Sequence, residues 1–88
     1  MPTVRLTPRF IKALQKLGHQ QIERAKKSLL QFQVNPRHPS LHFEKLSGSS
    51  YCTIRVDMNH RIVVRDEGDD RYEMVDIGNH DFVDRSYG

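Results

Sequence analysis

The chain has 88 residues, of which 36% are hydrophobic and 28% are charged. This length and composition predict one small folded domain, residues 1–88, and exclude a disordered protein. The single cysteine, Cys52, rules out an internal disulfide. No apolar run approaches the roughly 20 residues that cross a bilayer, and the first residues lack a signal-peptide pattern. We therefore expect a cytoplasmic protein with no membrane partner.

Charge is distributed unevenly along the sequence. Residues 1–61 contain eleven Lys or Arg and three Asp or Glu, a net charge of +8. Residues 62–88 contain three and eight of these, a net charge of −5. A basic excess of this size suits RNA or DNA as a partner, but charged surfaces are often simply solvated. Both interpretations stay open on charge alone.

Two helices are predicted in the first part of the chain. Thr7 and Pro8 form a typical helix start, because a hydroxyl caps free N–H groups and proline fits the first position. Apolar residues follow at helical spacing as far as Gly18, where this helix should end. A second helix is expected over about residues 19–34, ended by Pro36. The short connection predicts an antiparallel helical hairpin.

After the second helix the apolar period changes to 2, which indicates strands. Strands are expected at residues 3–6, 41–46, 51–57, 61–65 and 71–78. In the last of them Val75 and Ile77 are assigned to the buried side, although Tyr72 and Met74 are alternatives. The predicted fold class is α+β, with an N-terminal αα-hairpin packed on one face of a mainly antiparallel sheet.

The second face of this sheet is expected to stay open, because the two helices cover only one side. Alternation along the strands puts His42, Arg55 and Arg61 on the open face. His80 joins them if the backbone stays extended through Gly78. Four basic or titratable side chains would then meet on one surface.

Several segments carry a resemblance to a known family: Leu46-x-Gly48, Ile54-Arg55-Val56, the strand start at Arg61, and "IGNHDFVDR" near the end. In this order, and over nearly the whole chain, they resemble the RelE/ParE superfamily of toxins from type II toxin–antitoxin systems. The resemblance implies a microbial ribonuclease-like fold and a cognate antitoxin. RelE-like members cut mRNA in the ribosomal A site of the 30S subunit, whereas ParE-like members inhibit DNA gyrase.

Metal-independent RNA cleavage needs a base, an acid and cations around the phosphate. His80 is the main candidate for acid or base, since the pKa of histidine lies near neutrality, and Asp81 or Asp84 would orient its ring. A surface histidine that only caps the strand end is the alternative. Arg55 and Arg61 match the strand arginines of nuclease members and would bind the scissile phosphate. Ion pairs with neighbouring acids are the alternative for them.

Further residues complete the predicted site. His42 is a second candidate for acid or base, and Tyr87 could stack on a base or supply a hydroxyl. Lys45, Arg65 and Arg85 are candidate RNA contacts. No cofactor or metal is expected, because one cysteine and the lack of a Cys/His cluster offer no ligand set.

We therefore predict a type II toxin that acts as a ribosome-dependent mRNA endoribonuclease, inhibits translation and is neutralised by its antitoxin. Two alternatives stay open. The chain could be a ParE-like toxin that inhibits gyrase by protein binding. It could also be a degenerate toxin that binds only its antitoxin and, through that complex, operator DNA; the few aromatic side chains available for base stacking keep this alternative open.

Overall fold

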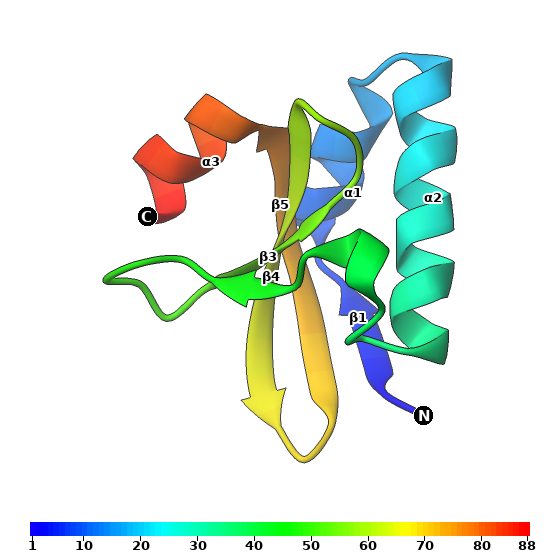
Figure 1. Ribbon diagram of the computed structural model, residues 1–88. Coiled ribbons are helices and arrows are strands. Elements are labelled where there is room, and N and C mark those ends of the chain that lie inside the picture. The colour runs from blue at the N-terminus through cyan, green and yellow to red at the C-terminus, as the bar shows by residue number, and fades with distance from the viewer.

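The computed structural model describes all 88 residues. The elements in chain order are β1 (Thr3–Leu6), α1 (Pro8–Gln15), α2 (His19–Val34), the 3₁₀ turn η1 (Pro39–Leu41), β2 (Glu44–Lys45), β3 (Cys52–Arg55), β4 (His60–Gly68), β5 (Arg71–Asn79) and α3 (His80–Tyr87). The sheet order is β1-β5-β4-β3-β2, parallel only between β1 and β5. Helices α1 and α2 lie on one side and α3 on the other (Figure 1). The α+β class is confirmed. None of the helices combines the length and apolar character needed to span a membrane.

Both predicted helices are present, and the predicted cap is formed. The Thr7 Oγ1 atom accepts a hydrogen bond from the Phe10 N–H at 3.1 Å and donates one to the Met74 carbonyl at 2.9 Å. The same hydroxyl therefore starts α1 and fastens it to β5. Helix α2 spans the residues expected for it and ends before Pro36.

The side of the sheet covered by α1 and α2, here the hairpin face, carries the apolar core. Phe32 meets Phe43 and Tyr72 edge-to-face, with ring centroids 5.3 and 5.0 Å away. Ten buried residues form one cluster there: Phe10, Ala25, Phe32, Leu41, Ile54, Ile62, Val64, Tyr72, Met74 and Ile77. Burial of this apolar surface is the main stabilising term of the fold.

The assignment of Val75 to the core is wrong, because β5 contains a bulge. Val63 pairs with Asp76, but the next residue, Val64, pairs with Met74, so Val75 has no partner. A bulge of one residue changes the phase of the alternation. Met74 therefore faces the core before the bulge, and Ile77 faces it afterwards.

The strand predicted over residues 41–46 is mostly absent. Pro39 begins the 3₁₀ turn, and His42 follows it in the left-handed region with φ 46°. Only Glu44 and Lys45 form a strand. His42 therefore lies exposed in a loop and not on a strand face, which corrects its predicted position.

The second face of the sheet is not open. Helix α3 crosses it, and its Val83 is 1% exposed while Val63 beneath is fully buried. The Asn79 side chain caps α3 by accepting from the Phe82 N–H at 2.8 Å. The backbone stays extended through Gly78 to Asn79, as expected, and His80 is the first residue of a helix. We call this side the α3 face.

Candidate active site

Two arginines face each other across neighbouring strands at one end of the α3 face. Arg55 of β3 and Arg61 of β4 are direct partners in the antiparallel register. Burial, together with the charge of Arg55, lowers the pKa of Arg61. The Arg55 Nε atom is buried and has no hydrogen-bond partner. Two cations opposite each other destabilise a sheet, so this pair is suited to hold an anion between its side chains.

The Arg61 guanidinium is fixed by the turn before β4. Its Nη1 atom donates to the Asp57 carbonyl at 3.0 Å and to the His60 carbonyl at 3.2 Å. Ion pairs with neighbouring acids were the predicted alternative, but Arg61 binds the backbone carbonyl of Asp57 and not its carboxylate. Neutral carbonyls orient the guanidinium, while the charges of Glu44, Asp57 and Asp84 act on it in the direction that raises its pKa, against the larger effect of burial.

The turn itself is held by the Asp57 carboxylate. Its Oδ1 atom accepts from the Asn59 N–H at 2.9 Å, the His60 N–H at 2.9 Å and His60 Nδ1 at 3.0 Å. Burial alone would raise the pKa of Asp57, but these bonds and the charge of His60 outweigh it, and the pKa is lowered. These bonds fix the turn, and the turn in that way positions the Arg61 side chain.

His80 reaches the same end of the face through α3. Its backbone N–H donates to the Asn59 carbonyl at 2.8 Å, which seats the start of α3 on the turn. Its Nε2 atom lies 3.5 Å from Asp84 Oδ2, and the Asp84 charge also acts on Arg61 and raises the pKa of that arginine. The His80 side chain is 56% exposed. The site thus joins a solvent-accessible imidazole, an orienting carboxylate and two guanidinium groups.

Tyr87 lies farther along α3 and is bound to the sheet. Its hydroxyl donates to Asp76 Oδ2 at 2.6 Å, and Asp76, which is 4% exposed, also accepts from the Ile77 N–H at 2.8 Å. Burial and the bond to Asp76 raise the pKa of Tyr87 to about 12. Seven residues of helix separate it from His80, or about 10 Å. In this arrangement its hydroxyl is engaged away from the arginine pair, and its predicted contact with RNA stays a prediction.

Arg65 belongs to a second polar cluster on the α3 face. Its Nη2 atom donates to the Tyr51 hydroxyl at 3.1 Å, and its Nη1 atom lies 3.6 Å from Glu73 Oε1. Arg5 pairs with the same carboxylate from the other side. Tyr51 meets Tyr87 edge-to-face at 5.1 Å, which joins this cluster to α3.

The remaining predicted residues are not gathered at the arginine pair. Lys45 pairs with Cys52 in the register, so it lies on the opposite side of the sheet from Arg55. His42 is exposed in its loop, and Arg85 is exposed on the last turn of α3. No group of three or more His, Cys, Asp or Glu side chains is placed to hold a metal ion.

Sequence reasoning missed α3 and, with it, the structural role of Asp76. One signal was available: Asn79 is a favoured cap, and Asp81 then falls in the first helical turn, where an acid is stabilised by the helix dipole. The spacing of His80, Asp84 and Tyr87 is also that of one helical face. The helix turns Val83 inward with the partly buried rings of Phe82 and Tyr87, while His80 and Asp84 stay about half exposed.

The fold is shared with solved toxin structures of low sequence identity. A YoeB/ParE toxin from Agrobacterium tumefaciens matches with a TM-score of 0.70 and 19% identity, over 89% of this chain and 98% of that one. The RelB–RelE antitoxin–toxin complex from Methanococcus jannaschii matches with a TM-score of 0.72 and 18% identity, over 90% and 93%. YafQ from E. coli matches with 0.72 and 13%, over 94% and 98%.

Comparison of the sequence with known families is more specific. No curated protein sequence is similar to this chain. The family model described as the ParE-like toxin domain matches residues 19–82, which include α2, β2 to β5 and the start of α3. The chain therefore belongs to the ParE-like toxin family of the RelE/ParE superfamily.

Proposed function

We propose that this protein is the toxin of a type II toxin–antitoxin pair and cleaves mRNA on the ribosome without a metal ion. The observation that carries the proposal is the Arg55–Arg61 pair beside the His80–Asp84 pair. Phosphate-binding cations and a titratable imidazole are what this reaction requires. The likeness of the fold to RelE, YoeB and YafQ toxins supports the same class.

The chemistry that these groups can perform is internal transfer at one phosphate. The ribose 2′-oxygen attacks the adjacent phosphorus, and the bond from phosphorus to the 5′-oxygen breaks, giving a 2′,3′-cyclic phosphate and a 5′-hydroxyl. One proton leaves the 2′-hydroxyl and one reaches the 5′-oxygen, so no water is consumed. Arg55 and Arg61 stabilise the charge on the phosphorane, while His80 exchanges a proton with the ribose or the leaving oxygen.

Access to this site is from the end of α3 that carries His80. The side chains of Tyr87 and Val83 cover the middle of the α3 face, whereas His80 is half exposed beside the turn at Asn59. A single strand of RNA would therefore approach Arg61 and His80 at the start of β4 and the end of β5, where α3 begins.

We also propose a cognate antitoxin as the partner, and a cytoplasmic location where mRNA and ribosomes are found. The solved neighbours include a RelB–RelE complex and a YoeB–YefM complex from Staphylococcus aureus. Binding of the antitoxin would neutralise the site, and the complex would bind operator DNA. Co-expression of the adjacent small gene should restore growth, and its product should co-purify with this chain.

The decisive test is cleavage of A-site mRNA on purified ribosomes by wild type and His80→Ala. We expect a loss of about 10²–10⁴-fold in rate, because a positioned acid or base contributes that much. His19→Ala, at the exposed start of α2, is the matched control and should cut at the wild-type rate. Arg61→Ala should weaken both RNA binding and cleavage. Equal rates for wild type and His80→Ala would remove the catalytic role of α3.

A second candidate function is inhibition of DNA gyrase by protein contact. Two observations favour it: the matching family model is described as ParE-like, and α3 covers much of the face that a nuclease would use. Purified protein would then block gyrase supercoiling, and His80→Ala would inhibit as strongly as wild type. Failure to inhibit supercoiling, with cleavage on ribosomes, supports the nuclease.

A further inference from the structure

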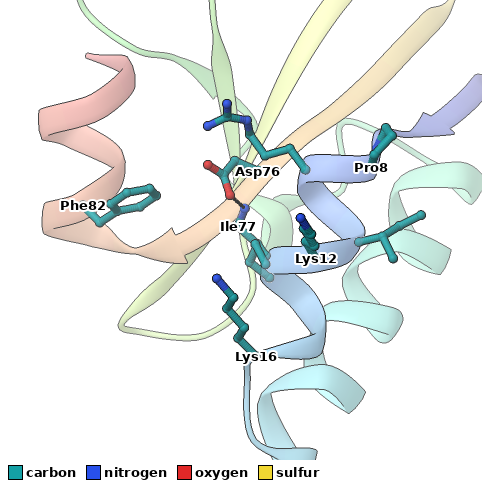
Figure 2. A pocket seen from close by; sticks show the side chains of 9 residues that line it. Pro8, Lys12, Lys16, Asp76, Ile77 and Phe82 are labelled. Carbon is teal, nitrogen blue, oxygen red and sulfur yellow. Dashed lines mark hydrogen bonds between the residues drawn. The ribbon is translucent and has the colours of Figure 1, made fainter.

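Two cavities of the molecule differ in their linings. The larger, of about 820 Å³, lies between α1 and α3, where the Phe82 ring reaches toward Ile77 opposite Lys12 and Lys16 of α1 (Figure 2). The smaller, of about 300 Å³, lies between α2, η1 and the end of β3, and we call it the α2 cavity. Nine residues line the α2 cavity, and only two of them are hydrophobic. Its chemistry is therefore that of a polar ligand.

One wall of the α2 cavity is a polar side of α2. The residues that form it are Arg24, Lys27, Ser28 and Gln31. They recur at intervals of three and four, so they lie on one side of the helix. Lys27 has no acidic partner within ion-pair distance, whereas its neighbour Lys26 lies 3.9 Å from Glu23 on the exposed part of the helix. The wall thus presents one cation that no carboxylate neutralises.

The one acid in the lining, Asp57, is already engaged on both carboxylate oxygens. Its Oδ1 atom accepts from the backbone of the turn before β4, and its Oδ2 atom lies 3.5 Å from Arg24 Nη1. The wall itself is fixed, because the Ser28 hydroxyl donates to the Arg55 carbonyl at 3.0 Å and fastens α2 to β3. Against the single negative charge of Asp57, α2 supplies two positive charges. The cavity is therefore a formed feature of the fold with a positive excess.

We propose that the α2 cavity binds a phosphate group. Lys27 supplies the positive charge, and Arg24 and Gln31 add N–H donors beside it. Liquid water takes about 30 Å³ per molecule, so the cavity has room for a phosphate group together with several waters. An amphipathic protein segment fits less well, because Leu41 in the lining is only 2% exposed and offers no apolar floor.

The phosphate group has two sources, a free phosphate ion or the backbone of a nucleic acid strand. Asp57 favours the backbone, because it joins the α2 cavity to the arginine pair: it lines the cavity, and its carbonyl accepts from Arg61 Nη1 at 3.0 Å. A strand that crosses this turn meets both sites. Identifying that strand as the RNA substrate rests on the proposed function, whereas binding of a phosphate group does not.

The first probe is a fluorescent 2′-O-methyl RNA of about ten nucleotides, within the usual site size of a single-strand binder. It lacks the 2′-hydroxyl and therefore cannot be cut. Fluorescence anisotropy measures its binding to the full-length protein. We expect Lys27→Glu to weaken binding by about tenfold and to reduce the slope of log affinity against log salt by about 0.7, as for one lost phosphate contact. The matched control, Lys26→Glu, has the same net charge and should change the affinity less than about twofold.

A second matched pair tests the wall without changing its shape. Gln31→Glu replaces an amide donor of the lining by a carboxylate and should weaken binding by about fivefold, whereas Gln33→Glu, exposed on the same helix, should not. Equal losses for the two lysine variants, or for the two glutamine variants, would overturn the proposal in favour of general attraction to a basic protein.

The two sources of the phosphate group are separated by nuclear magnetic resonance, with the side-chain amide signal of Gln31 as the reporter. A saturable shift with inorganic phosphate, and none with chloride at equal ionic strength, shows that the free ion is bound. A shift with the oligonucleotide alone assigns the cavity to a nucleic acid backbone. No shift with either probe would overturn the proposal. These assays contain no ribosome and no cleavable bond, so their failure is independent of the cleavage test.

Discussion

The two faces of the sheet are built by different physical means. On the hairpin face, ten residues of one apolar cluster are buried together, with three aromatic rings in contact. On the α3 face, Glu73 and Asp76 are 6% and 4% exposed, and each carboxylate is held by particular partners. The hairpin face depends on total apolar area, whereas the α3 face depends on whether each buried polar group is matched.

This difference has a functional side. A face held together by paired polar groups can also bind a charged ligand, at a place where a charged side chain lacks a partner. Arg55 and Arg61 are such a place, because the two cations face each other and Arg55 Nε has no partner. The proposed site and the stabilising polar clusters thus share one surface, and variants can separate the two roles.

The largest effect should come from the hairpin face. Phe32→Ala removes a fully buried ring that contacts Phe43 and Tyr72 and should lower the free energy of unfolding by about 3–5 kcal/mol. Urea unfolding followed by circular dichroism measures it. Leu30→Ala, on the same helix but 65% exposed, is the control and should stay within about 0.5 kcal/mol. A small loss at Phe32 would show that the hairpin face tolerates a cavity.

The next effect tests how closely α3 is seated. Gly78→Ala puts a methyl group 2.4 Å from Phe82 Cδ2 and should cost about 1–3 kcal/mol in unfolding free energy. A double-mutant cycle with Phe82→Ala isolates this contact. Gly78→Ala should cost clearly less in the Phe82→Ala background, and an equal cost in both backgrounds would remove Phe82 as the cause.

A smaller effect is expected from the polar anchor of α3. Tyr87→Phe leaves buried Asp76 with only the Ile77 N–H and should cost about 1–2 kcal/mol at pH 7. The pKa of Tyr87 is raised in the folded state, so its contribution is complete below pH 10 and is lost as pH rises toward about 12. Denaturant unfolding of both proteins across this range measures it. A constant difference between them would contradict the ionisation account.

The smallest effect concerns the turn before β4, which the Asp57 carboxylate holds. Asp57→Asn keeps an acceptor oxygen but removes the charge, and it should cost about 0.5–1 kcal/mol near neutral pH. The pKa of Asp57 is lowered by folding, so the contribution is present above the ordinary carboxyl range and is lost as pH falls through the lowered value. Wild type and Asp57→Asn should therefore converge in stability under acid conditions. A gap that persists there would point to packing.

The sequence predicted the hairpin face well because local signals suffice there. Thr7 marks the start of α1, and strict alternation placed Ile54 and Ile62 in the core. Gly18 was expected to end α1, but that helix ends at Gln15 and Gly18 caps the start of α2. The same alternation placed Arg55 and Arg61 on one face, and the register of β3 and β4 makes them direct partners there.

The α3 face was predicted poorly because its burial depends on partners. The bond from Tyr87 to Asp76 and the bond from Arg65 to Tyr51 form only when separate elements come together. A helix of eight residues is also too short for its apolar periodicity to stand out in the sequence. Lys45 shows the related limit, since its strand is too short for alternation to fix its side.

The bulge at Val75 has a consequence for comparing this protein with its relatives. Before Val75 the even-numbered residues of β5 face the hairpin helices, and after Val75 the odd-numbered residues do. A relative that lacks the bulge would need a one-residue gap at this point in an alignment. Without that gap, Tyr72 and Met74 would each be compared with a residue of the opposite face. A sequence profile built from such an alignment would mix residues of both faces at positions 72 and 74. Asp76, Gly78 and His80 would still be aligned correctly.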